Sequence, residues 1–507
     1  MIQNLTFLPV LLPMLAGVLL LMPPCGKNKT YRRITSVVLS AVTFLVSLAL
    51  LLKVQADGTQ VYAIGDWNAP FGIVLVADPL STLLVCLTTL LGVVCTLYAS
   101  AGDDAKGSFF HPLVHFLVLG VNGTFLTGDA FNLFVFFEVL LIASYSLLMH
   151  GGNKQNTRAA LQYVIMNLVG SAVFLIALGV LYGVLGTLNM ADMAQKVAHL
   201  QGDDVYLAKI GGLLLLVVFA LKGALLPLYL WLPNTYATAM PVVAALFAIM
   251  TKVGVYSMMR VYTLIFGDEA GELSHMAQNW LWWLALATIV MGAIGVLASQ
   301  DLRKLTANLV IVSVGTLVAL VAVQTIEASS AAIYYLVHST LVTAALFILA
   351  DLIGRQRGKI TDRITAGPPV SQPRLLGVCF LIAAVAVMGM PPLSGFIGKV
   401  WLLRATLNAE YTVVFWPLYL LVSLAILLAV SKAGSTIFWH HQDNAKVTES
   451  AVKERVHPAQ LVALIILISG APLMSIFAGP LSEYAIGAAT QLHDFNNNIN
   501  LILSGGQ

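Results

Sequence analysis

Four lysines lie inside apolar runs of this 507-residue chain: Lys222, Lys252, Lys399 and Lys432. A charged side chain at the centre of a membrane helix costs about 2.5–3.5 kcal/mol on insertion scales, so a chain that keeps one usually has a use for it. A lysine withdrawn from water can also gain and lose its proton near neutral pH. The pattern therefore predicts a set of proton carriers. For Lys432 a second interpretation stays open, because it is near enough to a span end for its ammonium group to reach the interface.

One acidic residue and one histidine have similar apolar neighbours: Glu138 in FNLFVFFEVLLIASYSLL and His338 in YYLVHSTLV. A buried carboxylate stays ionised only where a cation comes within about 4–6 Å, and a histidine relays protons through either ring nitrogen. We predict a functional role for Glu138, the alternative being a static ion pair with a lysine of another span. We predict that His338 is a proton relay, the alternative being a hydrogen-bonded core residue.

Two of the lysines stand beside sequences that break helices. Gly223 and Pro227 follow Lys222 in KGALLP, and a second cluster precedes Lys399 in MGMPPLSGFIGK. That second cluster contains Gly389, Pro391, Pro392, Gly395 and Gly398, of which Pro391, Pro392 and Gly395 are the main predicted break residues. Proline removes a backbone donor, and irregular backbone at membrane depth is tolerated only beside protein or a wet cavity. A simple kink is the alternative, but the lysine at each break favours a functional role.

Composition places the chain among membrane proteins that cross the bilayer many times. It is 59% hydrophobic and only 10% charged, far from the soluble globular range. The formal net charge of +3 argues against nucleic acid as a partner. The four cysteines show no C-x-x-C spacing, so neither a disulfide framework, a metal site nor a bound cofactor is expected.

Runs of about 20 apolar residues predict an all-α fold of about fourteen transmembrane helices. They lie near residues 3–22, 34–54, 76–99, 109–127, 130–149, 159–186, 209–232, 241–266, 279–299, 304–323, 329–354, 373–404, 412–439 and 458–488. Most of the 26 lysines and arginines fall in loops that share one side, which predicts that both termini lie on the outer side.

Two stretches of the chain resemble later stretches. The sequence from Ala160 resembles that from Ala332, and TKVGVYS from Thr251 resembles SKAGSTI from Ser431. The copies are five spans apart, an odd number, so they must enter the membrane from opposite sides, as in the inverted repeats of secondary transporters. The predicted division is 1–107 for three N-terminal spans, 108–268 and 269–440 for two inverted five-helix repeats, and 441–507 for an inner loop and the last span.

Five motifs in order carry a family resemblance: FFEVLLIASYSLL, LKGALLPLYLWLPNTY, VAALFAIMTKVGVYSMMR, YYLVHSTLVTAALF and MPPLSGFIGKVWLL. They resemble the antiporter-like membrane subunits of respiratory complex I and, most closely, the D subunits of Mrp-type cation/proton antiporters. The resemblance covers nearly the whole chain. It implies broken helices seven and twelve, and a subunit of a hetero-oligomeric complex in the bacterial plasma membrane, with other Mrp subunits and lipid as partners and protons and Na⁺ or K⁺ as substrates.

The resemblance also implies roles for five residues. Glu138 and Lys222 would be the ion pair, Lys252 the central lysine, His338 a relay and Lys399 the lysine of the outer half. Some complex I relatives have glutamate where Lys399 stands, which favours the Mrp family. The chain is thus expected to be a transport subunit rather than an enzyme.

Two alternatives remain at this stage. One is a proton-pumping membrane subunit of a complex I-like NADH dehydrogenase or membrane-bound hydrogenase, in which redox chemistry would belong to partners. The chain itself has no cysteine cluster for iron and sulfur and no Gly-rich nucleotide fingerprint. The other is an organic-solute symporter that works alone, for which a row of single lysines is poorly suited.

Overall fold

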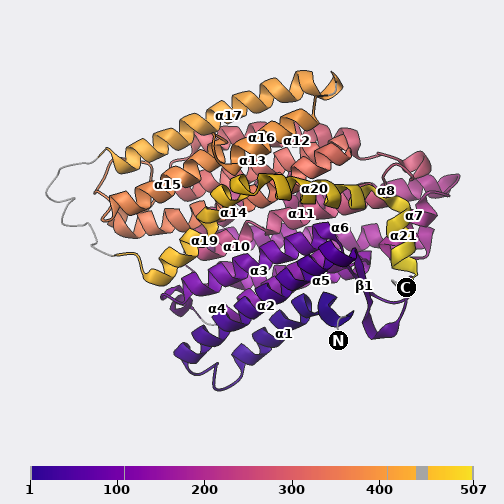
Figure 1. The fold of residues 1–507 in the computed structure, drawn as a ribbon, viewed down its shortest axis with the longest axis horizontal. Coiled ribbons are helices and arrows are strands. Elements are labelled where there is room, and N and C mark those ends of the chain that lie inside the picture. The colour runs from indigo at the N-terminus through magenta and orange to yellow at the C-terminus, as the bar shows by residue number, and fades with distance from the viewer. Residues whose placement is uncertain (1–2, 108, 153, 408, 441–454, 505–507) are drawn as a thin grey trace.

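The computed structural model describes residues 3–107, 109–152, 154–407, 409–440 and 455–504. These residues form an all-helical bundle with one short β-hairpin, and the long helices lie side by side along a common direction (Figure 1). Residues 441–454 of the predicted inner loop, and 505–507 at the end of the last predicted unit, lie outside the described residues.

The elements of the first part of the chain are α1 (Leu8–Leu21), α2 (Lys29–Asp57), β1 (Gln60–Ala63), β2 (Val74–Ala77), α3 (Pro79–Ala99), α4 (Phe110–Leu126), α5 (Ala130–Met149), α6 (Lys154–Leu185), α7 (Met190–Val197), α8 (Asp203–Gly223), α9 (Trp231–Thr238), α10 (Pro241–Phe247) and α11 (Met250–Leu264). The second part contains α12 (Gln278–Ala298), α13 (Leu302–Val323), α14 (Ile326–Gln356), α15 (Pro373–Met388), α16 (Ser394–Ala405), α17 (Ala409–Phe438), α19 (Pro458–Ile476), α20 (Ala478–His493) and α21 (Phe495–Leu503).

Eleven described helical segments are long and apolar enough to cross a membrane, and α1, α4 and α15 are shorter apolar helices. The prediction of a multi-span, all-helical membrane protein is therefore confirmed. The span predicted near 76–99 begins too early: residues 74–77 pair with β1, and α3 begins only at Pro79. Asp78 fixes that start, since its side chain accepts a hydrogen bond from the Ser81 backbone in a capping box.

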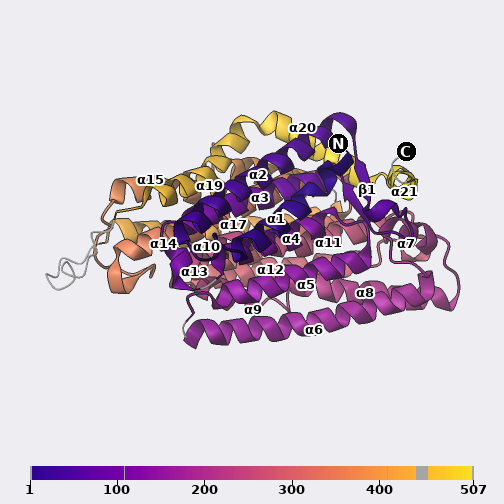
Figure 2. The same cartoon turned by 90° about the horizontal axis from the view of Figure 1, so that it is seen from below.

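Burial divides the helices into a centre and a perimeter. The apolar stretches of α10–α11 and α13 are buried throughout and that of α14 almost so, whereas α2 and α17 are mostly exposed. Figure 1 shows α17 along one edge of the bundle, and Figure 2 shows α6 along another. A residue on α11, α13 or α14 is therefore far from lipid, and α10, α11, α13 and α14 form the core.

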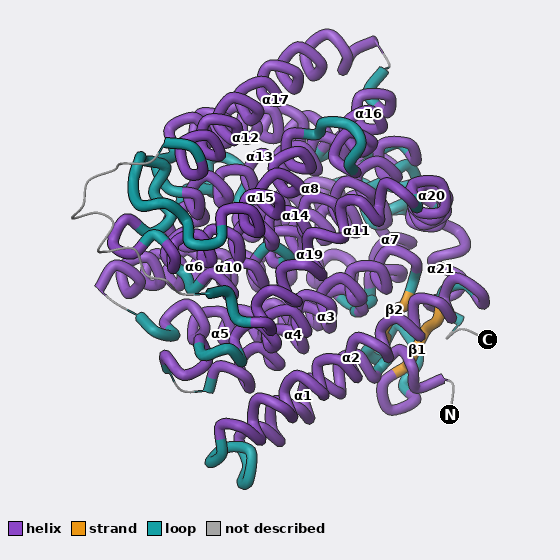
Figure 3. Tube along the Cα trace, turned by 60° about the vertical axis from the view of Figure 1, so that its left-hand side comes forward, coloured by secondary structure: helices purple, strands orange, loops and turns teal. Residues whose placement is uncertain are grey.

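The β-hairpin lies at the end of the bundle where the chain begins and finishes (Figure 3). Its two strands pair antiparallel in the register Gln60↔Ala77 to Ala63↔Val74. The hairpin was not predicted, because its strands are short and the second merges in sequence with the apolar run of α3.

Two neighbouring aspartates join the N-terminal helices to the rest of the molecule. Asp104 accepts a hydrogen bond of 2.9 Å from Nε of Arg33 on α2, and Asp103 lies 2.5 Å from Nη2 of Arg355 on α14. Both carboxylates are buried. One short loop between α3 and α4 thus ties α2 to the central helix α14.

Candidate functional site

Lys222 lies in the last turn of α8 and is buried, with 6% of its surface exposed. Its Nζ donates a hydrogen bond of 3.0 Å to Oδ1 of Asn167 on α6, and it lies 5.8 Å from the centre of the Phe137 ring. Asn167 is held in turn by a bond of 2.8 Å from its Nδ2 to the Tyr163 carbonyl. The ammonium group therefore has one fixed neutral acceptor and an aromatic neighbour.

Glu138 lies on α5 and is half-buried. Its carboxylate accepts a short hydrogen bond from the Ser171 hydroxyl, one turn beyond Asn167 on α6. The charges of Glu138 and Lys222 interact, but among the ion pairs of the described residues none joins the two directly. Two polar side chains of α6 instead hold the partners: Asn167 binds the lysine and Ser171 the carboxylate.

The break after Lys222 lies where the sequence places it. α8 ends at Gly223, Ala224 takes the left-handed conformation with φ 60°, and no helix resumes until Trp231. A Cβ atom on Gly254 would lie 2.5 Å from the backbone nitrogen of Gly223, so glycine is needed where α11 touches the end of α8. Trp231 donates to the Leu221 carbonyl at 3.2 Å, which satisfies one of the freed backbone groups.

Lys252 lies on α11 and is fully buried. Its Nζ donates a hydrogen bond of 3.1 Å to the hydroxyl of Ser313 on α13. Beside it, the buried Oγ1 of Thr251 has no hydrogen-bond partner among the described residues. Gly254, two residues after Lys252 on the same helix, touches Gly223, so Lys252 lies near the break that follows Lys222.

The second break surrounds Lys399. α15 ends at Met388, Gly389 is left-handed with φ +68°, and α16 begins at Ser394. Lys399 Nζ donates to the freed Met388 carbonyl at 2.7 Å and to the Ser423 hydroxyl at 3.0 Å. A Cβ atom on Gly389 would lie 2.4 Å from Cδ of Lys399, so this glycine makes room for the lysine.

The other predicted break residues lie around this turn. Pro391 and Pro392 are exposed, whereas Gly395 is buried. A Cβ atom on Gly395 would lie 1.9 Å from the Ala386 carbonyl oxygen, so α16 can start against α15 only with glycine at this position. In the first break, Pro227 lies within the turns between α8 and α9.

His338 lies on α14 and is buried. Its Nδ1 is 2.8 Å from the hydroxyl of Ser394, the first residue of α16, and the charge of Lys399 acts on its ring. The histidine therefore belongs to the Lys399 cluster.

Lys432 lies apart from these clusters. It is exposed on α17, a perimeter helix, where its ammonium group is free to extend along the surface. The structure thus places Lys222, Lys252 and His338 in buried positions, Glu138 and Lys399 in half-buried positions, and Lys432 on the surface.

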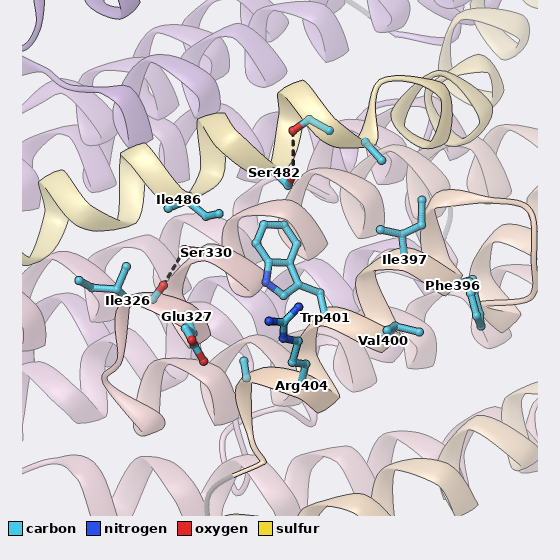
Figure 4. A pocket seen from close by; sticks show the side chains of 13 residues that line it. Ile326, Glu327, Ser330, Phe396, Ile397, Val400, Trp401, Arg404, Ser482 and Ile486 are labelled. Atoms are coloured by element: carbon cyan, nitrogen blue, oxygen red, sulfur yellow. Dashed lines mark hydrogen bonds between the residues drawn. The ribbon is translucent and has the colours of Figure 1, made fainter.

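A groove of about 640 Å³ lies on another face of α16, between α14 and α20 (Figure 4). Its lining is mainly apolar, and Figure 4 shows Arg404 beside Trp401, with Glu327 near the same end. Lys399 does not line it. This groove is separate from the row of titratable residues.

Sequence reasoning missed the neutral partners of the row, namely Asn167, Ser171, Ser313, Ser394, Ser423 and the carbonyl of Met388. A signal existed for two of them. Asn167 and Ser171 are polar, lie in an apolar run and are four residues apart, so they share one helix face. The others are single small residues or backbone atoms that only the packing reveals.

The sequence and the fold are similar to those of known proteins. The family described as "NADH:quinone oxidoreductase/Mrp antiporter, TM" matches residues 127–423. The chain is 38% identical to the probable K(+)/H(+) antiporter D subunit of Rhizobium meliloti over 97% of this chain and 96% of that one. It is 39% identical to the Na(+)/H(+) antiporter D subunit of Bacillus subtilis, over 92% and 94%. A chain in a solved structure of the Mrp complex from a Dietzia species superposes with a TM-score of 0.86, 25% identity and 99% coverage of both chains.

Proposed function

The chain belongs to the NADH:quinone oxidoreductase/Mrp antiporter family, and on that premise we propose that it is the proton-translocating subunit of a multisubunit Na⁺/H⁺ or K⁺/H⁺ antiporter complex. Relatives named as antiporter D subunits match it along nearly its whole length, which favours this function over a proton-pumping subunit of a complex I-like dehydrogenase or hydrogenase. Its partners would be the other subunits of the complex, in the bacterial plasma membrane.

The observation that carries the proposal is the row of buried and half-buried titratable side chains. Lys222 and Lys252 are buried on helices that touch through glycine, and Lys399 lies at the second break with His338 beside it. Each lysine nitrogen has a neutral hydrogen-bond acceptor rather than a carboxylate. In this arrangement such an ammonium group can release its proton without breaking a contact ion pair.

Glu138 is the control element of this mechanism. When the carboxylate is ionised and close, its charge favours the protonated form of Lys222. When it withdraws toward Ser171, Lys222 loses that stabilisation and its proton moves toward Lys252. The two α6 side chains allow both states, because Asn167 keeps the lysine in place while Ser171 holds the carboxylate.

We include in this proposal the number of membrane crossings, the inverted repeats and the orientation of the termini. About fourteen membrane crossings would comprise three N-terminal spans (1–107), two inverted five-helix repeats (108–268 and 269–440) and a last unit (441–507), with both termini outside. The breaks at Gly223 and Gly389, each beside a lysine, support the repeat. The excess of basic residues in the loops opposite the termini supports the orientation.

The test is proton/cation exchange in vesicles that hold the whole complex, followed with a pH-sensitive fluorescent dye. Lys222→Ala and Glu138→Ala should each abolish exchange while the complex still assembles. The matched control is Lys432→Ala, which removes an exposed lysine and should leave exchange unchanged. Full exchange in either of the first two variants would overturn the proposal.

A further inference from the structure

Between Lys252 and Lys399, the row of titratable residues described above has no member that is hydrogen-bonded to both. Lys252 lies on α11 and Lys399 on α16. Nδ1 of His338 is hydrogen-bonded to Ser394 at the start of α16, and no hydrogen bond of the described residues joins this histidine to either lysine. A proton that crosses from one half to the other needs intermediate groups that accept and donate. Hydroxyl groups do both.

Such groups lie between the two lysines. Ser313, on α13, accepts the hydrogen bond from Lys252. The hydroxyl of Tyr335, on α14, lies close enough to the side chains of Ser313, Thr316 and Tyr419 for an electrostatic interaction, and no direct hydrogen bond joins it to them among the described residues. One tyrosine therefore reaches both the partner of Lys252 and a residue of α17.

The far side of this cluster reaches Lys399. Its Nζ lies 5.8 Å from the centre of the Tyr419 ring and bonds to Ser423, one turn further along α17. Tyr419 also interacts with Tyr335 and Thr316. Ser313, Thr316, Tyr335 and Tyr419 are all buried, so the connection lies away from lipid.

We infer that the hydroxyl groups of Ser313, Tyr335 and Tyr419 form the lateral proton route between Lys252 and Lys399, an inference that rests on the function proposed above. His338 then serves the Lys399 end of the row, whereas Tyr335 joins the two halves.

The net reaction moves one proton from Lys252 to Lys399, and every hydroxyl on the route is neutral before and after it. Protonated Lys252 gives a proton to Ser313 Oγ, whose own proton passes through a bridging water to Tyr335, and Tyr335 passes its proton in the same way to Tyr419. The proton of Tyr419 reaches neutral Lys399 through a bridging water or Ser423. Lys252 ends neutral and Lys399 charged, and each hydroxyl has exchanged one proton for another.

The neighbouring tyrosines offer a matched pair of variants. Tyr335→Phe removes only the hydroxyl and keeps the ring. Tyr334→Phe makes the same change one residue away, where the hydroxyl donates to the Met474 carbonyl at 3.2 Å, outside the row. Both are to be made in the whole complex, with assembly checked by copurification of its subunits.

We expect Tyr335→Phe to lower the exchange rate at least tenfold and Tyr334→Phe to stay within twofold of the unaltered complex. Residual exchange in Tyr335→Phe should also show a larger solvent deuterium isotope effect, which a loss of packing alone would not produce. Equal rates in the two variants, or an unchanged isotope effect, would overturn the inference.

Tyr419→Phe and Ser313→Ala give an independent reading if Tyr335→Phe fails to assemble. Each should lower exchange at least tenfold, and wild-type rates in both would overturn the route. If Lys222→Ala abolishes exchange while all three hydroxyl variants are fully active, the proposed function stands and only the lateral route is wrong.

Discussion

The two broken helices hold their lysines in different ways. At the first break, Lys222 has a neutral amide acceptor and a carboxylate, Glu138, within electrostatic range. At the second, Lys399 has a backbone carbonyl and a hydroxyl. Among the described residues no carboxylate forms an ion pair with Lys399, and the acidic residues of the adjoining helix α14 lie toward its ends: Glu327 in its first turn and Asp351 paired with Arg355.

The sizes of the two kinds of interaction show why a carboxylate near Lys222 matters more than an extra hydrogen bond to Lys399. Two unit charges 4 Å apart interact by about 4 kcal/mol at an effective dielectric constant of 20. A hydrogen bond to a charged group contributes about 1.5–3 kcal/mol. Movement of Glu138 can therefore outweigh the fixed bond from Lys222 to Asn167, whereas Lys399 has no comparable charge to gain or lose. The first half is suited to control and the second to steady relay.

Glu138→Gln tests the difference between the two halves most strongly. The amide keeps the shape and a bond to Ser171 but loses the charge that is proposed to control Lys222. We expect exchange in vesicles to fall about 100-fold, within the usual range for loss of a group that directs proton transfer. A variant with more than half the normal rate would mean that the two halves are controlled alike.

Gly389→Ala tests the second half. The new methyl group would lie 2.4 Å from Cδ of Lys399, on a residue with φ +68° that disfavours any side chain. We expect about a tenfold fall in exchange as the lysine is displaced from the Met388 carbonyl. The control is Gly377→Ala on α15, the helix that Gly389 ends, where the added atom meets only the Phe438 ring at 3.7 Å. Similar rates in both variants would contradict the role of this carbonyl.

A smaller effect is expected from Ser423→Ala. Lys399 keeps the Met388 carbonyl and loses one hydroxyl acceptor, so exchange should fall only several-fold, in line with the loss of a single hydrogen bond. The measurement is the initial exchange rate at matched complex content. A loss as large as that of Glu138→Gln would mean that the second half is also a control point.

The smallest effect on transport is expected outside the membrane, at Asp362. Burial favours the neutral carboxyl, but hydrogen bonds from Arg303 and its charge outweigh burial and hold the pKa of Asp362 below its usual value. A lowered folded-state pKa contributes stability above the unfolded-state value, and this contribution is lost as pH falls through the folded-state pKa. Asp362→Asn should therefore lower the melting temperature at pH 7 and leave exchange unchanged, and the difference in melting temperature should shrink in strong acid. Lost exchange at normal stability would place Asp362 in the transport path.

The sequence predicted the charged members of the row because charge in an apolar run is conspicuous. Glu138, Lys222, Lys252 and Lys399 stand out in this way, and the breaks at Gly223 and Gly389 follow from glycine and proline. It did not predict the acceptors, because serine is common in membrane helices and a carbonyl such as that of Met388 has no sequence signal. The tyrosine cluster brings together α13, α14 and α17, a juxtaposition set by tertiary packing alone.

The most direct test of the central claim is exchange by a complex that carries Lys252→Met, since in the proposed route Lys252 is the lysine through which protons pass between the two halves. Methionine keeps the length of the side chain and removes the ammonium group, and Lys432→Met makes the same change at the perimeter. The account predicts an assembled complex with no proton/cation exchange for Lys252→Met and normal exchange for Lys432→Met. Normal exchange in the Lys252→Met complex would contradict it.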